Sequence, residues 1–143
     1  EKALQDLVAE FPHQVAVQIA FSEATAHQII AGSDIFLVPS RFEPCGLTQF
    51  YSLKYGTLPL VHATGGLYDS ICEHPQDGRS QNGFVFAEFS QAECESALTR
   101  AVTLYRNSPD AWQRLVETAK ASDPQRVPPT ITATKPFDLR IQI

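Results

Sequence analysis

The first third of the chain changes from helical to strand-like spacing of its apolar residues. In segment 1–10 the apolar side chains recur at helical spacing, as Ala3, Leu4, Leu7 and Val8. The run 15–20 (VAVQIA) is rich in β-branched residues and predicts a strand. Ser22 is a suitable N-cap for a helix over 23–32, and Gly32 is expected to end that helix.

The middle of the chain contains two continuous apolar runs, 34–38 (DIFLV) and 58–62 (LPLVH). Runs of this kind are typical of strands buried on both faces, as in a parallel sheet. Between them we expect a helix that starts near Gly46 and ends at Gly56, because glycine readily adopts the left-handed conformation of a helix end. The segment 64–71, which begins TGGL, is expected to contain a further short helix.

Turn and cap signals organise the segment that follows. A polar loop over 73–83 precedes a short predicted strand at 84–86 (FVF). The sequence SQAE at 90–93 is a capping box, which predicts a helix reaching about Tyr105. The pair Ser108-Pro109 predicts the start of one more helix.

The alternation of helices and strands predicts an α/β fold, with a Rossmann-like parallel sheet and flanking helices. We expect this unit to span residues 1–123. From there the pattern changes, because prolines at positions 124, 128, 129 and 136 exclude a continued helix. Residues 124–143 are therefore expected to form a proline-rich tail, with a short strand at 139–143.

Composition narrows the class of protein. The chain has 143 residues, 43% hydrophobic and 19% charged, which is ordinary for a globular domain. A net charge of −5 without a basic cluster argues against a nucleic-acid partner, and no apolar run is long enough to cross a membrane. Three cysteines without a C-x-x-C pair favour a reducing compartment. Because methionine is absent and the chain starts within an expected helix, we expect a piece of a longer protein.

Three expected loops follow strands and lie at the edge of the sheet where ligands bind in open α/β folds. These loops are residues 20–22, 39–48 and 63–67. The second loop leads into a helix, whose first N–H groups favour phosphate; the residues that would present them are Gly46, Leu47 and Thr48. In the third loop, Gly65 and Gly66 would allow a ligand to approach the backbone closely.

Glu43 stands in the second loop and does not suit a phosphate site, because a carboxylate repels a phosphate. An ionised carboxylate does accept strong hydrogen bonds from hydroxyl groups. A ligand that carries both a sugar and a diphosphate would explain Glu43 together with the glycine loops. No cluster of acidic residues of the kind used for Mg²⁺ is seen, so we expect no metal and no cofactor.

Three motifs, in this order along the chain, resemble the C-terminal half of bacterial and plant glycogen/starch synthases: SRFEPCGLTQ, KYGTLPLV and TGGL. The resemblance covers roughly residues 14–121, and E-P-C-G-L-T-Q is its most specific part. It implies a GT-B fold of two Rossmann-like domains, of which this chain is part of the C-terminal one. It also implies transfer of glucose from ADP-glucose to the non-reducing end of an α-1,4-glucan, with retention of configuration.

The resemblance further implies how the donor is held. Glu43 would be the catalytic residue that binds hydroxyls of the donor glucose, and Tyr51 lies where related enzymes often carry a second glutamate. Phe21 would pack against adenine. The other expected substrate-binding residues are Cys45, Gly46, Leu47, Thr48, Thr64, Gly65 and Gly66. The family's arginine and lysine for the donor phosphates, and its acceptor-binding N-terminal domain, lie outside this sequence. The family's cellular location is the cytoplasm, or a plastid in plants.

Several alternatives stay open on the residues alone. The chain could be a non-catalytic module that binds a nucleotide sugar, or part of a transferase with a different donor or acceptor. Phe21 could belong to the core, and Gly65 and Gly66 could form an ordinary turn. We expect Cys45 to fill a tight turn rather than to act as a nucleophile, because no base lies near it in the sequence.

Overall fold

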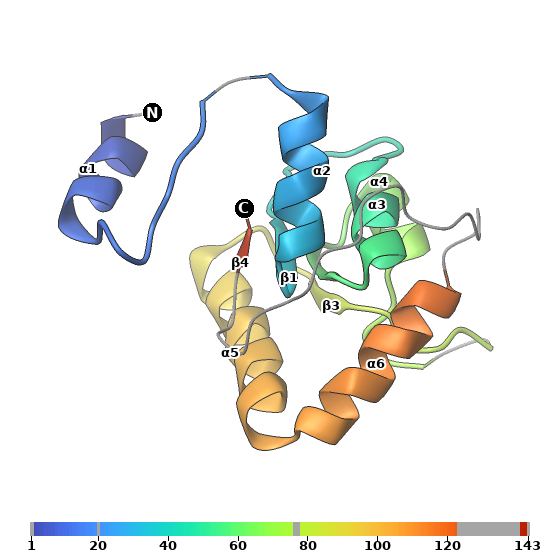
Figure 1. The fold of residues 1–143 in the computed structure, drawn as a ribbon. Helices are drawn as coiled ribbons and strands as arrows, with labels where there is room; N and C mark the ends of the chain where they lie inside the picture. The colour runs from blue at the N-terminus through green and yellow to red at the C-terminus, as the bar shows by residue number, and fades with distance from the viewer. Residues whose placement is uncertain (1, 20, 76–77, 123–140, 143) are drawn as a thin grey trace.

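A parallel sheet lies at the centre of the protein, in a computed structural model that describes residues 2–19, 21–75, 78–122 and 141–142 (Figure 1). Within these residues the sheet has four strands in the order β3-β2-β1-β4. The strands are β1 (Ile35–Val38), β2 (Leu58–His62), β3 (Phe84–Phe86) and the two-residue β4 (Ile141–Gln142). All neighbouring strands are parallel, which confirms the predicted Rossmann-like sheet.

The helices of the described residues fall close to their predicted places. They are α1 (Lys2–Glu10), α2 (Glu23–Gly32), α3 (Thr48–Tyr55), α4 (Gly65–Ser70), α5 (Gln91–Asn107) and α6 (Pro109–Ala121). Two predicted N-caps are confirmed, because the hydroxyls of Ser22 and Ser90 each accept a hydrogen bond from a backbone N–H three residues on. Gly56 ends α3 in the left-handed conformation, with φ of 69°.

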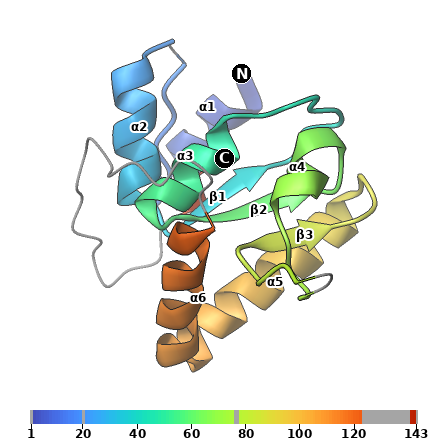
Figure 2. The ribbon, with the colours of Figure 1, turned by 90° about the vertical axis from the view of Figure 1, so that its right-hand side faces the viewer.

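Helices flank both faces of the sheet (Figure 2). Strand β2 pairs Phe36 of β1 and Phe84 of β3 with two successive residues of its own, so these two side chains point to opposite faces. On one face, Phe36 lies near Ile30 of α2. On the other face, the ring of Phe84 stacks on Trp112 of α6, with 6.3 Å between ring centroids.

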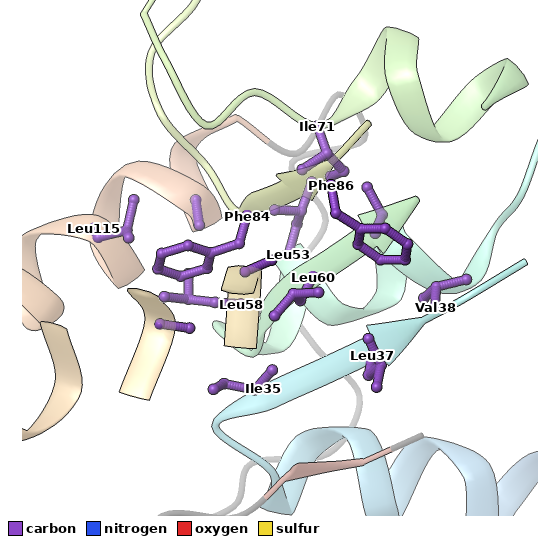
Figure 3. Close-up of a cluster of buried hydrophobic side chains, with 14 of the residues drawn as sticks. Ile35, Leu37, Val38, Leu53, Leu58, Leu60, Ile71, Phe84, Phe86 and Leu115 are labelled. Atoms are coloured by element: carbon purple, nitrogen blue, oxygen red, sulfur yellow. The ribbon is translucent and has the colours of Figure 1, made fainter. Parts of the chain in front are cut away.

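The hydrophobic core forms around β2, whose five residues are all buried. Figure 3 shows how Leu58 and Leu60 of β2 lie among the side chains of the neighbouring strands, with Leu53 of α3 close by. A strand buried on both faces must be apolar throughout, which is why the run 58–62 was recognisable in the sequence.

The predicted strand at 15–20 is wrong for residues 15–19, which have no strand partner; residue 20 lies outside the described part. Val15 and Val17 are half-buried while Ala16 and Gln18 are exposed, but Ile19 is exposed as well, so the alternation typical of a strand extends only over residues 15–18. A segment with strand-like spacing becomes a strand only where a neighbouring strand offers backbone groups for pairing. At the outer edge of β1, Ile35 and Phe36 pair instead with β4.

The two ends of the described chain differ in how they join the fold. Helix α1 has no buried residue and stands apart from the sheet (Figure 1). The predicted tail strand at 139–143 is confirmed for residues 141–142, which add to the sheet as β4. The predicted tail otherwise lies outside the described residues.

Candidate functional site

The loops that follow β1 and β2 meet at the carboxyl edge of the sheet. The backbone N–H of Gly66 donates to the carbonyl of Glu43, at 3.0 Å. A Cβ on Gly65 would lie 2.1 Å from that same carbonyl oxygen, and one on Gly66 would lie 2.2 Å from the carbonyl oxygen of Cys45. Both glycines are therefore needed for the contact between the loops. This explains them without a ligand, and their role toward a ligand stays a prediction.

The side chain of Gln49 holds the loop of residues 39–48 in place through hydrogen bonds. The sequence indicated no role for Gln49 beyond its place in the motif. The side chain is 0% exposed. Its Nε2 donates to the carbonyls of Cys45 (3.1 Å) and Gly46 (3.2 Å) and to the hydroxyl of Ser70 (3.3 Å). Its Oε1 is buried with no hydrogen-bond partner among the described residues. An unmet buried acceptor of this kind costs about 1–3 kcal/mol.

Glu43 is half-buried at the top of this supported loop. Its backbone carbonyl is fixed by Gly66. Within the described residues, no side chain or backbone group forms a hydrogen bond or ion pair with its carboxylate. None of the described residues therefore uses the capacity of this carboxylate to accept hydrogen bonds.

The start of α3, at Thr48, follows Glu43 closely along the chain. Gly46 turns the chain with φ of +60°, and Leu47 and Thr48 are exposed. No side chain caps the helix at Leu47. The first N–H groups of a helix have no partner within the helix, so this end of α3 can receive an anionic group.

The structure brings the first loop to the same edge. Ser22 and Thr48 line one cavity of about 200 Å³, which lies between α2 and β1. Phe21 precedes Ser22 and is fully exposed, so its assignment to the core is excluded; its role toward adenine stays a prediction.

Tyr51 and Cys45 have surroundings of different kinds. Tyr51 is half-buried and packs on His27 of α2, with 4.6 Å between the ring centroids. The imidazole Nδ1 of His27 lies 3.1 Å from the hydroxyl of Tyr55, so Tyr51 belongs to the contact between α2 and α3. Cys45 is an exposed free thiol. Thr64 is the half-buried N-cap residue of α4, without a side-chain cap bond.

Two basic side chains lie at this edge. The sequence supported no role for His62, and it allowed Arg41 to assist phosphate binding, which stays a prediction. His62 ends β2 with 9% of its surface exposed, and its Nδ1 donates to the carbonyl of Ser40 at 2.8 Å. Its ring packs between Phe86 and Phe89. The guanidinium of Arg41 lies 5.0 Å from the centroid of the Phe89 ring. The only signal for His62 in the sequence is its place at the end of a buried strand.

The described residues contain neither a metal-binding cluster nor a membrane-spanning helix. No group of three or more histidine, cysteine or acidic side chains in them could hold a metal ion. None of the described helices is both long and apolar enough to cross a membrane.

Comparison with known proteins identifies relatives over most of the chain, although no protein-family model matches it. The glycogen synthase of Cellvibrio japonicus is 50% identical over 117 residues, which are 80% of this chain and 24% of that protein. The glycogen synthase of Francisella tularensis subsp. novicida is 49% identical over 127 residues, which are 83% of this chain and 26% of that protein.

A solved structure matches as well. It is the catalytic domain of starch synthase IV from Arabidopsis thaliana, bound to ADP and acarbose, with a TM-score of 0.77 and 37% identity over 84% of this chain and 25% of that one. The sequence relatives and the structural relative agree with the resemblance of the three motifs. The chain is a homologue of the glycogen and starch synthases and spans about a quarter of the length of the relatives it matches.

Proposed function

We propose that this chain is the donor-binding part of a retaining glucosyltransferase of the glycogen/starch synthase type. Its reaction is the transfer of glucose from ADP-glucose to the non-reducing end of an α-1,4-glucan. Residues 1–123 are then part of the C-terminal domain, and the glucan binds mainly to a domain outside this sequence. The cytoplasm or a plastid is the expected location.

The observation that carries this proposal is that the carboxylate of Glu43 and the nearby start of α3 both lack a side-chain partner among the described residues. The carboxylate suits sugar hydroxyls, and the helix start suits a diphosphate. Both belong to the short segment 43–48 of the chain, so we expect one ligand that carries both groups to reach both. The matching Arabidopsis domain was solved with ADP and acarbose, which supports an adenine nucleotide as the donor's carrier.

In this proposal the chain contributes binding and orientation to the reaction. Glu43 holds the hydroxyls of the glucose so that its anomeric carbon faces the acceptor. The N–H groups of Leu47 and Thr48 stabilise the negative charge that grows on the diphosphate as the glycosidic bond breaks. The remaining positive charge for the leaving group comes from outside this sequence.

Calorimetric titration of the chain with ADP-glucose and with UDP-glucose tests the proposal. We expect saturable binding that is tighter for ADP-glucose. Glu43→Ala should weaken binding about 10- to 100-fold, which is the effect of one or two hydrogen bonds to a charged group. Glu117→Ala, which removes an exposed carboxylate on α6, is the matched control and should bind as the unchanged chain does.

Each outcome of the titration has a defined meaning. Loss of affinity in Glu43→Ala without loss of thermal stability supports the donor site. Equal affinity in both variants contradicts it, as does preference for a sugar nucleotide other than ADP-glucose. Binding by the chain without transfer by its full-length parent protein would instead identify a non-catalytic nucleotide-sugar module.

A further inference from the structure

The side chain of Gln49 connects the loop after β1 with helix α4, whose first residues belong to the candidate site. Its Nε2 holds the carbonyls of Cys45 and Gly46, both in the loop after β1. The same nitrogen donates to the hydroxyl of Ser70 in α4, and that hydroxyl donates to the carbonyl of Gly66 in the first turn of the same helix, directly after the loop that follows β2. One buried amide thus joins segments that are about twenty residues apart in the chain.

The orientation of this amide follows from the chemistry of its neighbours. Backbone carbonyls only accept hydrogen bonds, so the NH₂ group of Gln49 must face Cys45 and Gly46. This leaves Oε1 without a partner among the described residues. A Cβ on Gly46 would lie 2.5 Å from that Oε1, so the glycine and the glutamine are matched in shape. An apolar side chain would fill the same space without leaving an acceptor unmet, and it could not hold the two carbonyls.

The held carbonyls lie between the two ends of the proposed ligand site. Glu43 precedes Cys45 by two residues, and Thr48 begins α3 two residues after Gly46. Fixing Cys45 and Gly46 therefore sets the separation between the sugar-binding carboxylate and the phosphate-binding helix start. Gln49 is itself fully buried and does not touch the ligand.

We infer that Gln49 is a positioning residue, which holds Glu43 and the start of α3 at the spacing of one nucleotide sugar. The inference rests on the proposed function and adds a specific consequence to it. Loss of the amide should lower the affinity for a ligand that contacts both Glu43 and the start of α3. It should lower the affinity less for a ligand that contacts the start of α3 alone. ADP-glucose and ADP are the two ligands that make this comparison.

The test compares their affinities in Gln49→Met, which keeps the length and volume of the side chain and removes both amide protons. We expect affinity for ADP-glucose to fall about tenfold, the effect of about one hydrogen bond, and affinity for ADP to change at most about threefold. Ser52→Ala is the matched control. Ser52 is equally buried and donates to the backbone carbonyl of Gln49, but it does not touch the loop.

Gln49→Glu adds a second measurement, the pH dependence of the affinity for ADP-glucose. A side chain that only filled space would not produce such a dependence. In its neutral form the introduced carboxyl group can donate one hydrogen bond to the loop, whereas its ionised form repels both carbonyls. The ratio of ADP-glucose affinity in this variant to that in the unchanged chain should fall as pH rises from about 5 to 8. Ser70→Ala removes the hydroxyl that accepts from Gln49 in α4, and it should also lower the affinity for ADP-glucose. This variant keeps the test available if Gln49→Met does not fold.

The same affinity ratio in Gln49→Met and in Ser52→Ala would overturn the inference. If the unchanged chain binds no ADP-glucose, the proposed function fails, and amide hydrogen exchange then decides the positioning role separately. Faster exchange of the Gly66 amide, which donates to the carbonyl of Glu43, in Gln49→Met but not in Ser52→Ala would show that Gln49 holds the loop. Equal exchange in both variants would overturn that role.

Discussion

Buried polar side chains hold individual loops of this protein in place through hydrogen bonds. Glu73 is the clearest example. Its carboxylate is 8% exposed and accepts hydrogen bonds from the backbone N–H of Val85 (2.8 Å) and from Arg100 (2.7 and 2.9 Å). Burial raises the pKa of this carboxyl. The hydrogen bonds from Arg100 and Val85 and the charge of Arg100 together outweigh burial, so the pKa lies below its usual range.

This pair predicts how the stability of the fold depends on pH. The unfolded chain has a glutamate pKa of about 4.3, and the pKa in the folded state is lower. The carboxylate of Glu73 therefore stabilises the fold above about pH 4, and its contribution is lost as pH falls through the folded-state pKa. Glu73→Gln should lower the free energy of unfolding by about 1.5–3 kcal/mol at pH 7, as for other hydrogen bonds to charged groups.

Urea unfolding at a series of pH values measures this effect. The difference between Glu73→Gln and the unchanged chain should shrink steadily below about pH 4. Glu117→Gln is the control, because its pair with Lys120 is exposed and should contribute little at any pH. A difference for Glu73→Gln that stays constant with pH would show that the ionised carboxylate does not stabilise the fold.

At the scale of single residues, the sequence singled out a candidate site residue only where the signal for it lies within a few neighbouring positions. Glu43 was recognisable because the motif around it, the strand before it and the helix after it are all within a few residues. Gln49 is in the same motif, yet its hydrogen bond to Ser70 crosses 21 residues and its burial is a property of the packed fold. Glu73 and Arg100 are 27 residues apart, and no spacing rule connects a loop acid to a helix arginine at that distance.

At the scale of elements, the same contrast separates what was predicted correctly from what was not. The caps at Ser22 and Ser90 and the end of α3 at Gly56 depend on neighbouring residues, and the structure confirms them. The strand predicted at 15–20 depended on a partner strand elsewhere. The β-branched residues of segment 15–19 show only that this segment favours an extended backbone. Which segment pairs with β1 depends on the packing of the whole sheet, and that segment is β4.

Helix α2 is anchored to the sheet by one buried hydroxyl at its end. Thr57 is 0% exposed, and its Oγ1 lies 2.6 Å from the carbonyl of Ile30 and 2.8 Å from that of Ser33. Thr57→Val keeps the shape of the side chain and removes the donor, so we expect a loss of about 1–3 kcal/mol in the free energy of unfolding. Hydrogen exchange should also accelerate in the last turn of α2.

Thr57→Ser separates the hydroxyl from the methyl group. It keeps the donor and loses one buried methyl, so it should cost about 1 kcal/mol and leave exchange in α2 close to that of the unchanged chain. If the serine variant speeds exchange as much as the valine variant does, the packing of the methyl group anchors α2, and the hydrogen bonds do not.

At the scale of the whole molecule, apolar burial is concentrated around β2 and does not reach α1. The core cluster draws on the first three strands and on α3, α4, α5 and α6. The apolar side chains of α1 at Leu4 and Leu7 are 46% and 40% exposed. The amphipathic spacing of residues 1–10 predicted the helix correctly, but spacing shows only that a helix has an apolar face and does not show what covers it.

A pair of leucines tests where the stability of the chain resides, because they differ in burial and not in chemistry. Leu58 of β2 is 0% exposed, and Leu58→Ala should cost about 2–5 kcal/mol through lost burial and the cavity that remains. Leu7→Ala should change the free energy of unfolding by less than about 0.5 kcal/mol, as expected for an exposed position. Both values come from urea unfolding, with the slope of the transition as a check that the unfolded states are alike. A cost for Leu7→Ala close to that for Leu58→Ala would mean that the apolar face of α1 is buried in solution, and the view that stability resides around β2 would be wrong.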